Sequence, residues 1–174
     1  MAIKELLDFI PPPALPIDGT GDSGVPERQF AVSFPADFKE LIQRYGTGYF
    51  YGDLRVANPL RAWGRDWIRD SLSGYRELRD AVELELRLFP ESPGLLPWGR
   101  DSNGHLYCWW TEGPPDAWGI VQLFHNYEGE VEVVPGPITS FLVRFIRNEY
   151  TNMLGGTPFS DQHHFFRQGT PAEQ

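Results

Sequence analysis

Apolar residues recur at the three-to-four-residue spacing of a helix face in two places near the start of the chain. Residues 2–10 form the first, and the run of prolines that begins at Pro11 ends it. Pro35 opens the second helix and Gly46 closes it. The apolar face of this second helix comprises Phe34, Phe38, Leu41, Ile42 and Tyr45. Residues 11–26, rich in Pro, Gly and Asp, predict an extended connection between the two.

A longer stretch with helical spacing of its apolar residues predicts a third helix in the middle of the chain. It begins near Ser71 or Ser73, both good N-cap residues, and continues through Phe89. Trp63 and Trp67 fall in the connection that precedes it.

A fourth helix is predicted near the end of the chain. Thr139 or Ser140 caps it, and it ends near Tyr150. Its inward-facing residues are Phe141, Leu142, Phe145 and Ile146. The chain then turns polar and aperiodic, although three phenylalanines are available to dock it onto the body: Phe159, Phe165 and Phe166.

Alternation of apolar and polar residues predicts strands between these helices. One strand runs within residues 49–57. The second half of the chain contains four more strand-like stretches: LLPWG, HLYCWWT, WGIVQLFH and VEVV. In the last of them, Val131 and Val133 are expected to face the core, while Glu130 and Glu132 face outward. Four strands in succession predict an antiparallel meander.

This order of elements predicts an α+β fold, a single domain with a mainly antiparallel, twisted sheet and helices packed against it. A chain of 174 residues with 41% hydrophobic content is long enough for one cooperative core. We expect residues 1–29 to form an N-terminal helix and a Pro/Gly-rich connection, residues 30–154 to form the domain body, and residues 155–174 to form a C-terminal tail.

Four local motifs carry a resemblance to a known family. They are FPADFKELIQRYG at residues 34–46, WGRDSNGH at residues 98–105, WGIV at residues 118–121 and SFLVRFI at residues 140–146. Together they resemble the signature of the SUKH superfamily, which includes bacterial toxin-immunity proteins and fungal cell-wall assembly regulators. The residues that match its motifs are Phe34, Pro35, Tyr45, Gly46, Asp101, Asn103, Gly104 and Trp118. The resemblance implies that residues 30–154 are a SUKH-like domain with the same α+β layout.

The charge balance narrows the classes of partner. Fifteen Lys and Arg stand against 24 Asp and Glu, for a net charge of −9. Such a surface repels nucleic-acid phosphate and anionic membranes and attracts a basic protein. The alternative is that the charge has no specific partner, since many proteins are acidic simply because net charge keeps them dispersed. Cys108 is the single cysteine, and the chain has neither a secretory signal pattern at its start nor an apolar run long enough for a membrane span. We therefore expect a cytoplasmic protein.

Candidate metal and cofactor sites are weak. Asp101, Asn103 and Asp116 provide oxygen ligands, but the spacing around them is not that of a calcium loop. A strand-entry turn, in which Gly104 takes a positive φ, is the better interpretation. The four histidines show no helical i, i+4 pair, and the glycines of Gly46–Gly48 lack the lysine of a phosphate loop. We expect no metal and no cofactor.

Catalytic residues are no better supported. Paired carboxylates for a glycosidase are available as Glu112 with Asp116, or among Glu128, Glu130 and Glu132. The sequence does not show the separation of the two carboxyl groups, and the strand pattern points Glu130 and Glu132 into solvent. Cys108, inside an aromatic strand, is typical of a buried, inert thiol. We expect no enzymatic activity.

The aromatic strand is the more informative candidate for binding. Tyr107 and Trp109 lie on one face of it, and this face is either covered by other elements or partly exposed to a partner. The candidate partner-binding residues are Asp101, Glu112, Asp116, Glu128, Glu130, Glu132, Tyr107 and Trp109.

Two functions from different classes remain open. The first is an immunity-type protein that binds a basic toxin, for example a nuclease, and occludes it without chemistry. The second is a regulatory or scaffold module that binds signalling proteins or peptides. The sequence leaves the oligomeric state undetermined.

Overall fold

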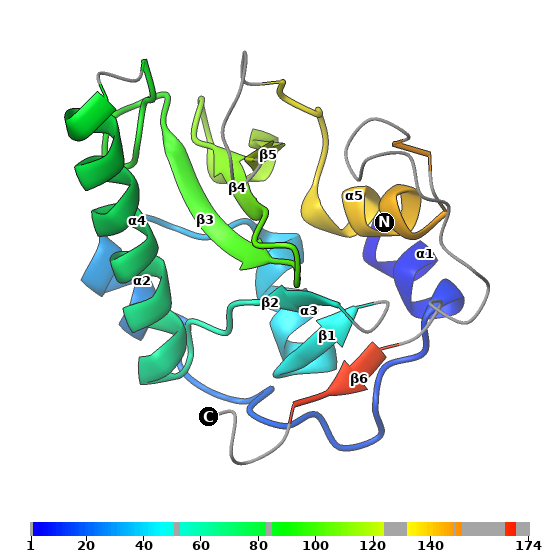
Figure 1. Cartoon of the computed structure of the whole chain (residues 1–174). Coiled ribbons are helices and arrows are strands. Elements are labelled where there is room, and N and C mark those ends of the chain that lie inside the picture. The colour runs from blue at the N-terminus through cyan, green and yellow to red at the C-terminus, as the bar shows by residue number, and fades with distance from the viewer. Residues whose placement is uncertain are drawn as a thin grey trace.

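An antiparallel sheet of six strands lies at the centre of the structure, a computed structural model that describes residues 2–50, 53–82, 85–123, 132–147, 149–150 and 166–169 (Figure 1). In chain order its elements are α1 (Ala2–Phe9), α2 (Gly24–Phe30), α3 (Ala36–Tyr45), β1 (Gly48–Phe50), β2 (Leu54–Val56), α4 (Ala62–Val82), β3 (Leu95–Arg100), β4 (Leu106–Trp110), the 3₁₀ turn η1 (Pro115–Ala117), β5 (Gly119–Leu123), α5 (Ile138–Ile146) and β6 (Phe166–Gln168). The strand order is β5-β4-β3-β2-β1-β6, and every neighbouring pair is antiparallel. The predicted α+β fold is confirmed.

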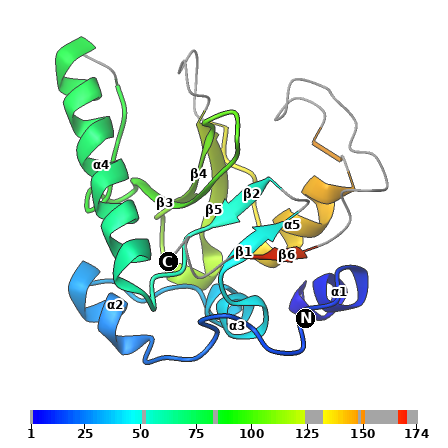
Figure 2. The same cartoon turned by 60° about the horizontal axis from the view of Figure 1, so that its bottom comes forward.

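Helices lie on both sides of this sheet (Figure 2). α3 and α5 pack on one face with α1 beside them, whereas α4 runs along the other face next to β3. The phenol of Tyr45 in α3 donates a hydrogen bond to the carbonyl oxygen of Ile10, which ties α3 to the end of α1. One face of the sheet is therefore closed by three helices and the other by a single helix.

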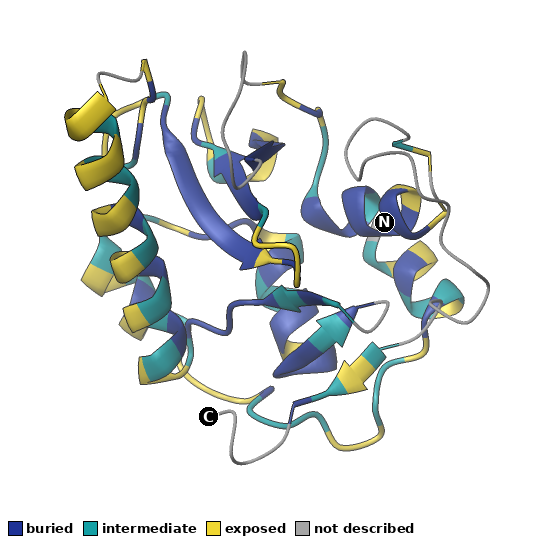
Figure 3. Ribbon diagram, viewed as in Figure 1, coloured by how far each residue is buried: buried dark blue, intermediate teal, exposed yellow. Residues whose placement is uncertain are grey.

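The core lies between the sheet and α3 and α5, where buried residues are concentrated (Figure 3). Its largest side chains are aromatic. The Trp109 ring meets Phe38 edge-on at a centroid distance of 4.7 Å and lies 5.8 Å from Phe34. Trp98 contacts Phe141 of α5 in the same edge-on way at 6.0 Å. Such pairs add specific geometry to the burial of apolar area, so the aromatic strand and the helix of the first motif form one unit.

α4 begins earlier than its sequence pattern indicates. The expected start near residues 71–73 is wrong, because those serines lie inside the helix. Trp63 and Trp67, which the pattern placed in a connection, belong to its first turns. A Cβ atom on Gly64 would lie 2.0 Å from the carbonyl oxygen of Asn58, so the close approach of helix and preceding loop requires glycine there. Because this contact is with the loop before the helix, the spacing of apolar residues within the helix gives no sign of it.

Two shorter elements also differ from expectation. Residues 24–30, expected in an extended connection, form α2, whose Pro26 occupies the first turn, where a proline costs no hydrogen bond. Ala31 ends that helix in the left-handed region at φ 52°. The single strand expected within residues 49–57 is a hairpin of β1 and β2.

The stretch after β5 supplies one bridging residue to the sheet. The backbones of Val134 and Ile120 exchange two hydrogen bonds of 2.8 Å. The prediction that Val133 faces the core is wrong, because 38% of it is exposed, whereas Val134 is buried. A shift of one residue exchanges the two faces of a strand. Val131 lies outside the described residues.

β6 completes the sheet from within residues 155–174, the stretch predicted to be a C-terminal tail. Phe166 packs on Tyr45 with ring centroids 5.1 Å apart, and the Gln168 side-chain oxygen accepts a 3.0 Å hydrogen bond from the backbone of Ile17. Phe159 and Phe165 lie outside the described residues.

Candidate partner-binding surface

The turn between β3 and β4 is organised around the carboxylate of Asp101. This side chain accepts hydrogen bonds from the backbone N–H groups of Asn103 and His105, both at 3.0 Å, and from the phenol of Tyr107 at 2.9 Å. Gly104 takes a φ of 84°, which favours glycine. Asp101 is only 3% exposed, so its charge serves the turn and is not presented to a partner.

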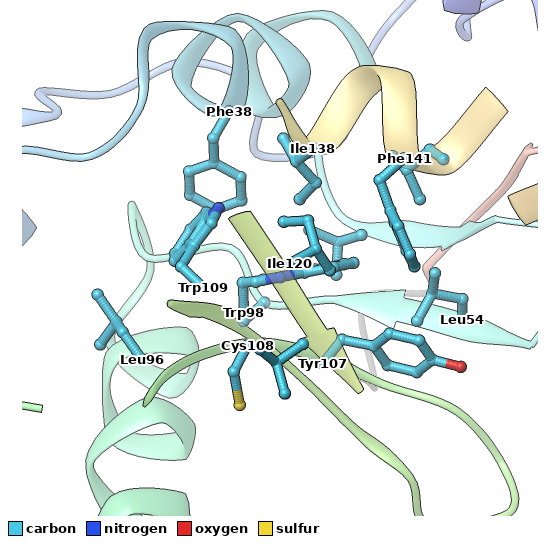
Figure 4. Close-up of a cluster of buried hydrophobic side chains, with 14 of the residues drawn as sticks. Phe38, Leu54, Leu96, Trp98, Tyr107, Cys108, Trp109, Ile120, Ile138 and Phe141 are labelled. Carbon is cyan, nitrogen blue, oxygen red and sulfur yellow. The ribbon is translucent and has the colours of Figure 1, made fainter. Parts of the chain in front are cut away.

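The aromatic residues of β4 that were candidates for binding are buried. Tyr107 is 0% exposed and Trp109 1% exposed. Trp109 points toward Phe38 of α3 (Figure 4), and Tyr107 packs against Phe141 and Phe145 of α5. The Tyr107 oxygen also accepts a hydrogen bond of 2.9 Å from the Gln122 side chain. Of the two possibilities for this face, the covered one is observed. This corrects the assignment of Tyr107, Trp109 and Asp101 to a partner-binding surface.

Three of the acidic candidates are exposed: Glu112, Asp116 and Glu132. Glu112 accepts a 3.2 Å hydrogen bond from the indole of Trp110, and Asp116 accepts one of 2.7 Å from the backbone N–H of Ala36 at the start of α3. Asp116 therefore stabilises a helix N-terminus while remaining exposed. Glu128 and Glu130 lie outside the described residues.

The segments that carry these carboxylates lie side by side at one end of the sheet. The Ile120–Val134 bridge holds residues 132–134 against β5. A Cβ atom on Gly119 would lie 2.5 Å from a methyl group of Val133, which shows how closely the segments approach. We call Glu112, Asp116, Glu132 and the exposed Val133 the acidic end. Residues 111–118 and 132–137 contain no Lys or Arg.

Asp37 of α3 lies between Asp116 of the acidic end and the start of α5. The sequence did not predict that this residue has a functional role or caps another helix. Its carboxylate accepts two hydrogen bonds of 3.0 Å from Thr139, one from the backbone N–H and one from the hydroxyl, at the start of α5. Neither Thr139 nor Ser140 is the N-cap, because α5 starts at Ile138 and ends at Ile146 rather than near Tyr150. Burial raises the pKa of Asp37, and the neighbouring charge of Asp116 adds to this.

The larger cavity next to α3 offers no catalytic arrangement. It has a volume of about 430 Å³ and lies between residues 19–26 and α3. Lys39 on its wall forms a 3.0 Å ion pair with Glu27. Cys108 is buried, and burial raises the pKa of its thiol far above the ordinary value, which disfavours the reactive thiolate.

Two further kinds of site are absent from the described residues. These residues contain no cluster of three or more His, Cys, Asp or Glu residues that could hold a metal ion. Within the same part of the chain, no helix has the length and apolar character needed to cross a membrane.

Comparison with known proteins gives one finding. The family model SUKH_6, described as SMI1-KNR4 cell-wall, matches residues 26–142, which is more than half of the chain. The matched range contains α3, the Asp101 turn, the aromatic strand and the exposed carboxylates Glu112, Asp116 and Glu132. No match is found among curated proteins or solved structures.

Proposed function

Because the chain belongs to the SUKH superfamily, through its SMI1-KNR4 cell-wall family, we propose that it is an immunity-type binding protein that neutralises a basic toxin in the cytoplasm by stoichiometric occlusion. The family supports a protein-binding role in general, as an immunity or regulatory protein without catalysis. The identity of the partner as a toxin, for example a nuclease, is the specific part of the proposal.

The acidic end is the observation that carries this proposal. It presents three exposed carboxylates beside an exposed valine, on two segments without a basic residue. A nuclease must hold phosphate and is therefore basic around its active site. An acidic surface steers a basic partner toward it, and the adjacent apolar side chain can be desolvated in the complex. Occlusion of the toxin then needs no reaction by this chain.

The first experiment is affinity capture from the producing cell with the full chain as bait, followed by association-rate measurements with the captured partner. The double variant Glu112→Lys/Glu132→Lys reverses two charges and leaves Asp116, which stabilises α3, in place. We expect its association rate at low salt to fall by roughly tenfold or more. High salt should slow the unmodified pair and reduce the difference between the two proteins.

The matched control is Asp70→Lys/Glu77→Lys, which makes the same charge change on exposed positions of α4. It should associate at a rate close to that of the unmodified chain. Equal rates for the unmodified chain and both variants would exclude the acidic end as the contact surface. A captured toxin should also lose its activity completely at one equivalent of this protein.

The alternative is a regulatory or scaffold module that binds signalling proteins or peptides, which the fungal members of the superfamily suggest. Gene neighbourhood separates the two functions. A toxin gene beside this one favours immunity, whereas its absence, together with capture of a signalling protein, favours the regulatory role.

A further inference from the structure

A row of basic and aromatic side chains crosses four strands on the sheet face next to α4. Arg167 of β6 pairs with Tyr49 of β1, and Tyr49 also pairs with Arg55 of β2. Arg55 in turn pairs with Arg100 of β3. Residues directly opposite each other in an antiparallel sheet project from the same face. Three arginines therefore share one face of a chain whose net charge is −9.

α4 supplies two tryptophans to this face. Trp63 and Trp67 are one helical turn apart and both line the space between α4 and the sheet. The Arg55 guanidinium carbon lies 4.6 Å from the centroid of Trp63 and 5.8 Å from that of Tyr49. On the far side of Tyr49, the guanidinium of Arg167 lies 4.4 Å from the same ring. Stacking of this kind holds arginine side chains in defined positions.

A small cavity opens where the row meets α4. Its volume is about 90 Å³, and its walls are Arg55, Ala57, Trp63, Trp67 and Arg100. Every polar side-chain group in these walls is a hydrogen-bond donor, since guanidinium and indole groups have no acceptor. We call this cavity the donor pocket.

Two further observations concern donors of the residues that line the donor pocket. The indole nitrogen of Trp63 is buried and has no hydrogen-bond partner among the described residues. The same is true of Trp98, but that ring is fully buried in the aromatic core. Arg100 is exposed and forms no ion pair within the part of the chain that the structure describes. A buried donor without an acceptor is unfavourable, and the exposed guanidinium of Arg100 is accessible to an acceptor-only ligand.

We propose that the donor pocket binds the carboxylate of an acidic side chain on a partner protein. A volume of about 90 Å³ accommodates a single carboxylate group, whereas pockets for drug-sized ligands have about 300 Å³ or more. The planar fork of Arg100 matches a carboxylate in a bidentate manner, and the flat indole walls suit a planar group. The net charge of −9 disfavours a polyphosphate or nucleic acid at the same place.

The donor pocket is separate from the acidic end, because the two lie at opposite ends of the strands. A role for the pocket therefore goes beyond the proposed function. Arg100 ends β3 beside the turn to β4, whereas Glu112 follows the end of β4 that pairs with the start of β3. A partner that used both would present a basic patch to one and an acidic residue to the other. The Glu112→Lys/Glu132→Lys variant should leave the pocket intact, so the two proposals can fail separately.

The test follows the indole N–H signal of Trp63 by nitrogen-15 NMR on the full chain, with Trp63→Phe used for assignment. Sodium acetate is titrated in at constant ionic strength against sodium chloride. We expect a saturable movement of this signal with acetate and none with chloride. A short C-terminally amidated peptide with one glutamate among alanines should bind more tightly than acetate, and its amidated glutamine version, which has no carboxylate, should not bind.

Variants decide whether the arginines are responsible. Arg100→Gln should weaken acetate binding by about tenfold or more, since charge-assisted hydrogen bonds are roughly twice as strong as neutral ones. Arg87→Gln makes the same charge change at an exposed position outside the pocket and should bind acetate normally.

Three outcomes would overturn the proposal. They are the absence of saturation with acetate, an unchanged affinity in Arg100→Gln, and tighter binding of inorganic phosphate than of the glutamate peptide.

Discussion

The two faces of the sheet use the same aromatic residue types in opposite ways. Under α3 and α5, the rings of Trp98, Tyr107 and Trp109 are fully buried and contact one another. On the α4 face, Trp63 and Trp67 are only partly buried and share a small cavity with arginines. Three helices close the first face and one helix lies on the second. Whether a tryptophan is buried in the core or accessible to a ligand is therefore decided by what covers it, and not by its residue type.

The polar groups on the two faces differ in the same way. The Tyr107 hydroxyl is held between Asp101 and Gln122 by hydrogen bonds of 2.9 Å each. The Trp63 indole has no such partner among the described residues, and the nearby charges are basic. A satisfied buried network stabilises one conformation. A cavity whose polar wall groups are all donors instead favours a ligand that accepts hydrogen bonds.

Among the substitutions that distinguish the two faces of the sheet, Trp109→Ala is expected to have the largest effect on the free energy of unfolding. Removal of this ring leaves a cavity beside Phe38, Phe34 and Trp118, and the free energy of unfolding should fall by about 3–5 kcal/mol. Trp67→Ala, the control on the α4 face, should cost about 1–2 kcal/mol because less apolar area is lost. Urea unfolding measures both variants. Equal losses would show that the two faces are packed alike.

Asp101→Ala should have the next largest effect. It leaves the Tyr107 hydroxyl and the backbone N–H groups of Asn103 and His105 without this acceptor, and we expect a loss of about 2–3 kcal/mol in the same unfolding measurement. Glu112→Ala removes an exposed carboxylate that also accepts a single hydrogen bond and should change stability by less than about 0.5 kcal/mol. If the two substitutions cost the same, Asp101 is not the structural centre of its turn.

The elements that local signals define were predictable from the sequence. α3 follows from its apolar spacing between Pro35 and Gly46, and β3, β4 and β5 follow from strand-like stretches bounded by turn residues. The Asp101–Gly104 turn has a local cause as well, because its hydrogen bonds connect residues close in sequence. Local order of this kind was enough for the fold class and for the family resemblance.

The candidate site depends on contacts between distant residues, and those were not predictable from the sequence. β6 pairs with β1 across more than a hundred residues, and only this register aligns Arg167 with Tyr49. The start of α4 depends on the approach of Gly64 to the Asn58 loop, so Trp63 and Trp67 were placed in a connection. The burial of Tyr107 depends on the packing of α5 over β4. Periodicity in the sequence shows on which face of a helix or strand a residue lies, but not what covers that face.

The smallest expected effect on stability, and the sharpest contrast between the faces, belongs to Arg100→Gln. Arg100 stands directly opposite Arg55, and like charges in such a pair are destabilising. Its removal should therefore leave the free energy of unfolding unchanged or raise it by a few tenths of a kcal/mol, while carboxylate binding weakens by about tenfold or more. Tyr107→Phe on the aromatic face should instead cost about 1 kcal/mol, because the hydroxyl between Asp101 and Gln122 disappears. A loss greater than about 1 kcal/mol for Arg100→Gln would make that arginine part of the packing, and the α4 face would then be structural like the other.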